Sequence, residues 1–175
     1  AAVLSNAPDD DLISTGRNVR FPIASAAELL AVCEAEQLSI AQIVRANEAA
    51  FRNESETEEG LDRIASEMMN CIPAGLAREG ELPGSLKVKR RARGIYEKLR
   101  SRERPNEAET LMDWLNLFAM AVNEENASGH RVVTAPTNGA AGIIPAVIRY
   151  YCYNDGVLET TKARDFLLTA AGIGL

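Results

Sequence analysis

The residues best placed to do chemistry form one short loop: Thr137, Asn138, Gly139 and Ala140. Asn and Gly tolerate positive φ, so we expect a sharp turn that presents two short polar side chains. An apolar segment of helical length follows, up to about Tyr153. The first amides of such a helix lack intrahelical partners and carry the positive end of its dipole, which suits a carboxylate or phosphate. An ordinary capped helix start explains the same residues, and spacing alone favours it.

Other polar groups precede this loop. Glu124 and Glu125 are paired carboxylates between Asn123 and Asn126, and such pairs can act as acid and base. They can equally end a helix in solvent or support the loop, and we favour this structural role. His130 is the only histidine. A lone histidine in a loop is usually exposed, so we assign it no catalytic role, and the catalytic residues stay unknown.

The chain has three cysteines, Cys33, Cys71 and Cys152. Their spacing contains no CxxC and no zinc pattern. Cys33 and Cys71 fall in apolar helical stripes, where a free cysteine behaves as a small core residue. We therefore assign no metal ligand, and such a scattered set suits a reducing compartment.

Helix starts are legible along the chain because a polar cap precedes Glu or Gln at the third helical position. Such boxes begin at Ser25, Ser39, Ser55 and Asn106. The first predicts a helix to about Glu36, and the second predicts a face of Ile40, Ile43, Val44 and Phe51. Pro73 should kink the third helix or end it near Ile72. A basic helix is expected over residues 91–100.

The helix predicted from Asn106 to about Asn126 is apolar around most of its circumference, which indicates a central position. Gly129 is its expected C-terminal stop. After the loop, a buried face is expected from Ile143, Ile144, Val147 and Ile148, with the helix ending at the turn 154–156. Thr160 or Thr161 should cap a last helix. The prediction is therefore an all-α, multi-helix domain over 21–175 around a central apolar helix, preceded by an extended arm over 1–20.

Composition narrows the possible functions. The chain has 175 residues, 46% hydrophobic and 25% charged, with a net charge of −6, which argues against nucleic-acid binding. The basic run from Lys87 to Arg93 is better explained as a solvated loop than as an RNA-binding patch. No apolar run reaches the length of a membrane span, and no signal peptide begins the sequence. A cytoplasmic location is the default expectation.

A longer pattern surrounds the loop. The string APTNGAAGIIPAV, preceded by LMDWLNLFAMAVNEENASGHRVV, resembles the iron–sulfur L-serine dehydratases (L-serine ammonia-lyases) of bacteria. The likeness continues upstream in FPIASAAELLAVCEAEQLSIAQIV and GELPGSLKVKRRA, so it covers roughly residues 20 to 175. Members of that family also carry a GPSSSHT-like segment and cluster cysteines in GCQGE, TCDP and VPC contexts, which do not occur here. We therefore expect an internal fragment that includes the start of the catalytic alpha domain.

The resemblance implies a function. Such enzymes convert L-serine to pyruvate and ammonia by β-elimination of water, with a [4Fe-4S] cluster as Lewis acid. The cluster ligands would lie outside this sequence, so the chain alone should be inactive. The expected role of this chain is to bind the carboxylate of L-serine through Thr137, Asn138, Gly139 and Ala140. A homodimer and the enzyme's remaining domains are the expected partners.

Two alternatives stay open. The chain could be a non-catalytic helical module that binds an anion or regulates another protein. A nucleotide-binding loop over 138–142 is weaker, because the sequence lacks the Gly-Lys-Ser/Thr ending of a P-loop and the βαβ setting of a dinucleotide-binding turn.

Overall fold

The computed structural model describes residues 18–101, 107–135 and 137–174. Within these ranges the protein is all-α, as predicted, with a single small β-hairpin. None of the described helices combines the length and hydrophobicity needed to cross a membrane. The α-helices are α1 (Ala26–Glu36), α2 (Ile40–Glu48), α3 (Glu54–Ala77), α4 (Ala92–Arg100), α5 (Glu107–Ala127), α6 (Ile143–Tyr151) and α7 (Thr160–Ile173).

The chain divides into two compact units. The first consists of Ala1–Arg63 with Thr160–Leu175, and the second is Ile64–Glu159. Helix α3 contributes its first residues to one unit and its last residues to the other. Each unit has its own packing, described in turn below.

Local capping chemistry starts the helices of the first unit. The Ser39 hydroxyl accepts from the Gln42 amide at 3.3 Å, and Gln42 Oε1 accepts from the Ser39 amide at 2.8 Å. The Ser25 hydroxyl caps α1 through the Glu28 amide at 3.2 Å. Both predicted starts are therefore confirmed. The Glu28 carboxylate accepts from the amide of Ala24 instead of Ser25, so only half of that box forms.

The third predicted start is wrong by two residues. Asn53 Oδ1 accepts from the Glu56 amide, and Glu56 Oε2 accepts from the Asn53 amide, both at 2.9 Å. This box begins α3 at Glu54, whereas Ser55 lies inside the helix and bonds to Glu59. The helix continues through Pro73 to Ala77. Of the two predicted outcomes, a kink or an end near Ile72, the end is therefore wrong. Cys71 and Ile72 on this helix are buried, and this packing favours continuation despite the missing N–H of Pro73 and the crowding by its ring.

Helix α7 packs against α2 at a position where only a small residue fits. A Cβ on Gly172 would lie 2.7 Å from Ile40 Cγ2. Ile43 and Val44 are buried as expected, but Phe51 is exposed because α2 ends at Glu48. Thr160 is the first residue of α7 and not its cap.

An ion pair joins α3 and α7 within the first unit. The Arg164 guanidinium donates from Nε to Asp62 Oδ1 at 2.7 Å and from Nη2 to Oδ2 at 2.6 Å. Its Nη1 lies 2.9 Å from Glu58 Oε1. The hydrogen bond from Arg164 lowers the pKa of Asp62 below its ordinary value of 3.8, against a smaller opposing effect of burial.

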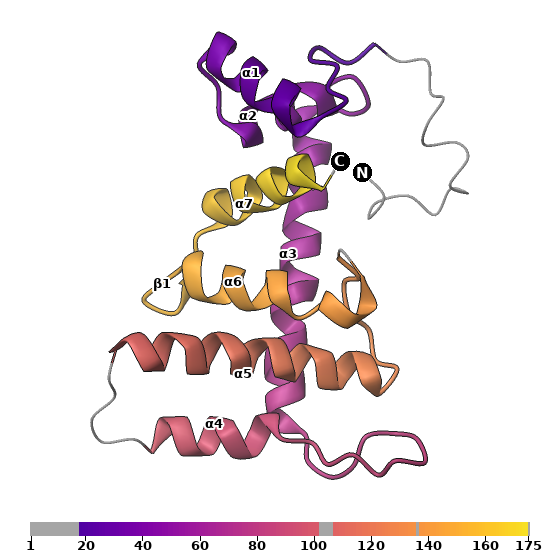
Figure 1. Ribbon diagram of the computed structural model, residues 1–175, viewed down its shortest axis with the longest axis vertical. Helices are drawn as coiled ribbons and strands as arrows, with labels where there is room; N and C mark the ends of the chain where they lie inside the picture. The colour runs from indigo at the N-terminus through magenta and orange to yellow at the C-terminus, as the bar shows by residue number, and fades with distance from the viewer. Residues whose placement is uncertain (1–17, 102–106, 136, 175) are drawn as a thin grey trace. The chain divides into compact units, whose positions relative to one another are not determined.

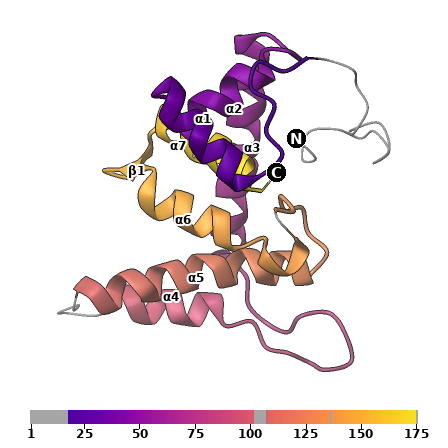
Figure 2. The same ribbon diagram turned by 45° about the horizontal axis from the view of Figure 1, so that its top comes forward.

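In the second unit, α5 lies between α4 and α6 (Figure 1), and the turned view of Figure 2 also shows α4 against α5. Leu117, Ala121 and Val122 are fully buried, which confirms the central position predicted for this helix. Its start predicted at Asn106 lies outside the described residues. Backbone meets backbone twice: a Cβ on Gly75 would lie 2.3 Å from the Ala121 oxygen, and one on Gly142 would lie 2.3 Å from the Ala119 oxygen.

The end of α5 is a Schellman motif. Gly129 has φ +73°, its amide donates to the Asn126 carbonyl at 3.0 Å, and the His130 amide donates to the Glu125 carbonyl at 3.0 Å. The predicted stop at Gly129 is confirmed. The positive φ of Gly129 turns the chain at the end of α5, and the chain then leads to the loop Thr137–Ala140.

Helix α6 begins later than predicted, at Ile143, after a short 3-10 turn over Asn138–Ala140. The delay changes which side chains face inward: Ile148 is buried, but Ile143 is 57% exposed. After the helix, β1 (Tyr153–Asn154) pairs with β2 (Val157–Leu158). Asp155 and Gly156 join them with positive φ at both positions, the conformation of a type I′ turn.

Substitution of Gly142 tests the close approach of α5 to the start of α6. Gly142→Ala should destabilise the protein by about 1–3 kcal/mol, because the new methyl group meets backbone that cannot move aside. Gly94→Ala is the matched change: it lies in α4 with no atom within 4 Å, and it should stabilise by about 0.5–1 kcal/mol. Urea unfolding followed by circular dichroism measures both. Equal effects would contradict the packing.

The Asp62–Arg164 pair predicts a pH-dependent contribution to stability. Since the pKa of Asp62 is lower in the folded state, its stabilisation is present above the unfolded value near 3.8 and is lost as pH falls through the folded pKa. Arg164→Gln should therefore lower the free energy of unfolding at pH 6 and do so less at pH 3. Urea titrations of both proteins across this range measure the difference, and a pH-independent gap would contradict the assignment.

Candidate functional site

The loop predicted to bind an anion forms a 3-10 turn on the end of α5. The Ala140 amide donates to the Thr137 carbonyl at 3.2 Å, and the Ala141 amide donates to the Asn138 carbonyl at 3.3 Å. Among the described residues, nothing accepts from the amides of Asn138 and Gly139. Thr137, Asn138 and Gly139 are exposed and Ala140 is half-buried. The four predicted residues therefore present two adjacent N–H donors at the surface.

Two neighbours hold Asn138 in place. Asn126 Nδ2, in the last turn of α5, donates to the Asn138 carbonyl at 2.9 Å. Thr134 Oγ1 donates to Asn138 Oδ1 at 2.8 Å. With the side-chain oxygen used in this way, Asn138 Nδ2 is a further donor for which no described residue is an acceptor. The arrangement is suited to an anion, and Thr137 adds a hydroxyl although it makes no capping bond.

Gly139 does not have the conformation that was predicted. Positive φ values occur at Gly80, Gly84, Gly129 and Gly156 among the described glycines, and not at Gly139. The prediction was wrong because tertiary contacts from Asn126 and Thr134 fix the turn as 3-10. A Cβ on Gly139 would meet no protein atom within 4 Å. The space beside this glycine is open to a ligand.

Glu124 and Glu125 are buried, with 5% and 2% exposure, and are not the solvated helix end that was one expectation. Glu124 Oε1 accepts from the amides of Arg91 at 2.6 Å and Ala92 at 3.2 Å, so it caps α4. Glu125 Oε1 lies 3.0 Å from Arg90 Nη1. These contacts support the structural role favoured from the sequence.

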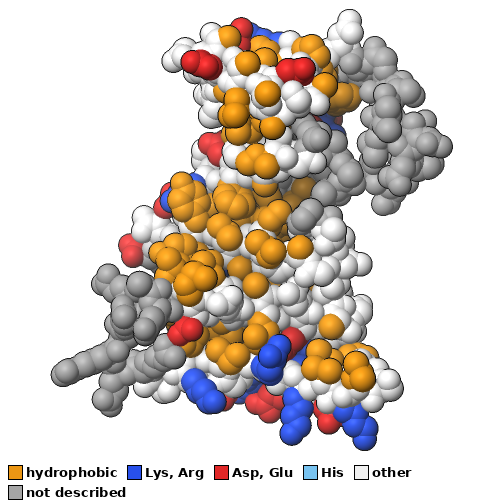
Figure 3. Space-filling view, viewed as in Figure 1, with side chains coloured by type: hydrophobic (Ala, Val, Ile, Leu, Met, Phe, Trp, Pro, Cys, Tyr) orange, Lys and Arg blue, Asp and Glu red, His pale blue; other side chains and the backbone are white. Residues whose placement is uncertain are grey.

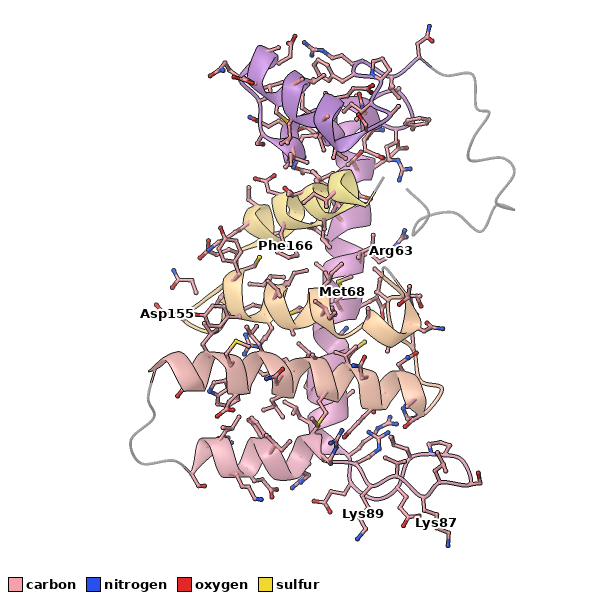
Figure 4. The ribbon with its side chains drawn as sticks, in the orientation of Figure 1. Arg63, Met68, Lys87, Lys89, Asp155 and Phe166 are labelled. Carbon is pink, nitrogen blue, oxygen red and sulfur yellow. The ribbon has the colours of Figure 1, made fainter. Side chains whose placement is uncertain are left out.

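Arg90 and His130, both expected at the surface, belong to the same network, and His130 is exposed as predicted. The Arg90 side chain is only 5% exposed, although it belongs to the basic run predicted to be solvated. His130 Nδ1 lies 3.1 Å from Glu125 Oε2, and Arg78 contacts the same ring. Lys87 and Lys89 fit the prediction: their side chains extend from the loop away from α5 (Figure 4), where lysine and arginine gather at the surface (Figure 3).

A groove lies between the loop that precedes α4 and one face of α5. Its volume is about 650 Å³ and it opens to solvent. Sequence reasoning missed it, because it exists only where two distant segments meet. The polar pair Asn123-Glu124, which interrupts the apolar α5, was its one available signal. The lining residues of α5 are Asn116, Ala119, Met120, Asn123, Glu124 and Ala127.

The cysteines do not fit the thiolate ligands of an iron–sulfur cluster. Cys71 is buried, and its Sγ donates to the carbonyls of Glu67 at 3.1 Å and Arg131 at 3.3 Å. Burial raises the pKa of the Cys71 thiol, and the charges of Glu67 and Glu125 add to the effect. Cys152 is fully buried, and Cys33 belongs to the other unit. The described part of the chain contains no group of three potential metal ligands.

Known proteins resemble this chain over most of its length. An L-serine dehydratase of Streptomyces coelicolor is 47% identical over 174 residues, which is 95% of this chain and 38% of the relative. L-serine dehydratase 1 of Escherichia coli is 46% identical over 158 residues, 90% of this chain and 35% of the relative. The chain thus spans little more than a third of the relatives it matches.

The family comparison covers the site itself. The serine dehydratase alpha chain family matches residues 35–175, a range that includes α5, the turn at its end and the groove beside it. With this match and relatives above 40% identity, the chain belongs to the serine dehydratase alpha chain family.

Proposed function

We propose that this chain is part of an L-serine dehydratase, which deaminates L-serine to pyruvate and ammonia. L-serine loses water to give aminoacrylate, and addition of water to the imine tautomer then releases ammonia. The names of the relatives support this substrate. The observation that carries the proposal is the exposed turn, in which no described residue accepts from the amides of Asn138 and Gly139.

The turn is proposed to bind the carboxylate of L-serine. The two amides and Asn138 Nδ2 are donors, and a carboxylate accepts charge-assisted hydrogen bonds from such groups. Asn126 and Thr134 fix the donors before a ligand arrives, so little ordering is needed on binding. Holding one end of the substrate rigidly orients its hydroxyl and α-hydrogen for elimination. We assign the general base to no residue of this chain.

The family resemblance supports three further proposals. A [4Fe-4S] cluster would belong to the complete enzyme, with ligands outside the sequence shown, because the cysteines here do not fit it. A homodimer and a cytoplasmic location are proposed on the same ground. The alternative of a non-catalytic anion-binding module predicts binding to the turn without turnover of L-serine by the complete protein.

Substitutions in the turn test the proposal in the complete enzyme. Gly139→Ala should leave stability unchanged, because its Cβ meets no protein atom, and should raise KM for L-serine roughly tenfold by obstructing the ligand. Asn138→Ala removes a donor to a charged group and should lower kcat/KM roughly ten- to a hundredfold. Steady-state kinetics measures both, with thermal unfolding in parallel.

Gly94→Ala is the control, since that glycine is also exposed and unobstructed but lies on α4. It should leave the kinetics unchanged. If Gly139→Ala and Asn138→Ala keep full stability and an unchanged kcat/KM, the turn is a structural feature only and the carboxylate binds elsewhere.

A further inference from the structure

Two buried oxygen atoms in the groove beside α5 lack hydrogen-bond donors. Among the described residues, nothing donates to Asn123 Oδ1 or to Glu124 Oε2. Both residues line the groove between α5 and the loop before α4. A buried acceptor without a donor is costly, and the cost is larger for a charged group. Two such atoms on consecutive residues of one helix leave a place for a donor that the described residues do not supply.

The nearest cation is already engaged. Arg90 Nη1 lies 4.0 Å from Glu124 Oε2, beyond hydrogen-bond distance, but 3.0 Å from Glu125 Oε1. Its Nη2 donates to the Ser128 hydroxyl and to the Glu124 carbonyl. Glu124 Oε1 is used by the amides that start α4. Of the two carboxylate oxygens of Glu124, only Oε2 therefore still lacks a hydrogen-bond donor, as does Oδ1 of the preceding residue, Asn123.

The chemistry of these atoms selects the ligand. A carboxylate oxygen and an amide oxygen both accept hydrogen bonds, and their combined charge is negative. An anion would be repelled by Glu124, whereas a primary ammonium group supplies three N–H donors and a compensating charge. Lys89 and Arg91 also line the groove, but the two atoms without donors are both acceptors, and an ammonium group would satisfy them.

We propose that Glu124 Oε2 and Asn123 Oδ1 bind the α-ammonium group of the amino-acid substrate. This inference rests on the proposed function, in which the turn at Asn138 takes the carboxylate. Asn126, which donates to the Asn138 carbonyl, lies one helical turn beyond Asn123, a rise of about 5 Å. Both half-sites are therefore built on the last turns of α5, the groove through Asn123 and Glu124 and the turn through Asn126.

A comparison of two competitive inhibitors of the complete enzyme separates the half-sites. L-alanine has both charged groups but no hydroxyl to eliminate, and 3-hydroxypropionate has the carboxylate and hydroxyl but no ammonium. Glu124→Gln keeps an oxygen for the amides that start α4 and replaces Oε2 with an N–H donor. This substitution should raise the inhibition constant of L-alanine roughly ten- to a hundredfold. The inhibition constant of 3-hydroxypropionate should change less than twofold.

Two substitutions of Asn123 provide a second test, and both leave the cap of α4 intact. Asn123→Ala should weaken L-alanine several-fold, and Asn123→Asp, which keeps an acceptor, should restore it. Glu97→Gln, the same change on the exposed face of α4, is the control and should alter neither inhibitor. If Glu124→Gln misfolds by circular dichroism, the Asn123 variants decide the question.

The outcomes distinguish this inference from the proposed function. Gly139→Ala should weaken both inhibitors, and if it weakens neither, the turn proposal fails while the ammonium site can stand. If the groove variants leave L-alanine binding unchanged, water alone fills the groove and the inference is overturned. Equal weakening of both inhibitors by Glu124→Gln and Asn123→Ala would also overturn it, because a structural disturbance would then explain the loss.

Discussion

The buried carboxylates at the end of α5 are the constraint on which the second unit depends. Glu124 starts α4 by accepting its first amides, and Glu125 fixes Arg90. Arg90 in turn bonds to Ser128 in the turn that ends α5. Removing one partner of such a buried pair costs about 3–5 kcal/mol, because the remaining charge stays unpaired. The network therefore joins the loop before α4, α4 itself and the end of α5 into one rigid corner.

Small residues make the second contribution to that rigidity. Gly75 and Gly142 let the backbone of α5 touch α3 and the start of α6 at Ala121 and Ala119. Interiors packed this closely transmit small displacements. Because Gly142 lies two residues after the end of the 3-10 turn, its contact with α5 restricts the position of the turn. Positioning of the proposed substrate donors thus follows from packing several residues away.

Local chemistry was predictable from the sequence where one residue decides the outcome. Ser25, Ser39 and Gly129 end or begin helices by bonds to their immediate neighbours, and all three predictions hold. Ser55 failed because Asn53 offers an equivalent box two residues earlier, and the two patterns overlap. The loop at Thr137–Ala140 was identified from its Asn-Gly turn and the apolar helix after it, and the family resemblance added L-serine as the expected ligand. The arrangement of its donors became clear only in three dimensions.

Features made by distant segments could not be predicted in this way. The φ of Gly139 depends on Asn126 and Thr134, which hold Asn138 from outside the turn. Burial of Glu125 depends on Arg90, which the sequence places in a basic run typical of solvated loops. The groove depends on that loop lying against α5.

A crystal structure of the complete enzyme with L-alanine bound tests the central claim most directly, that this end of α5 recognises both charged groups of an α-amino acid. The account predicts the carboxylate within hydrogen-bond distance of the Asn138 and Gly139 amides, with the ammonium group at Glu124 Oε2 and Asn123 Oδ1. Density for L-alanine at a site that touches neither the turn nor the groove would contradict it.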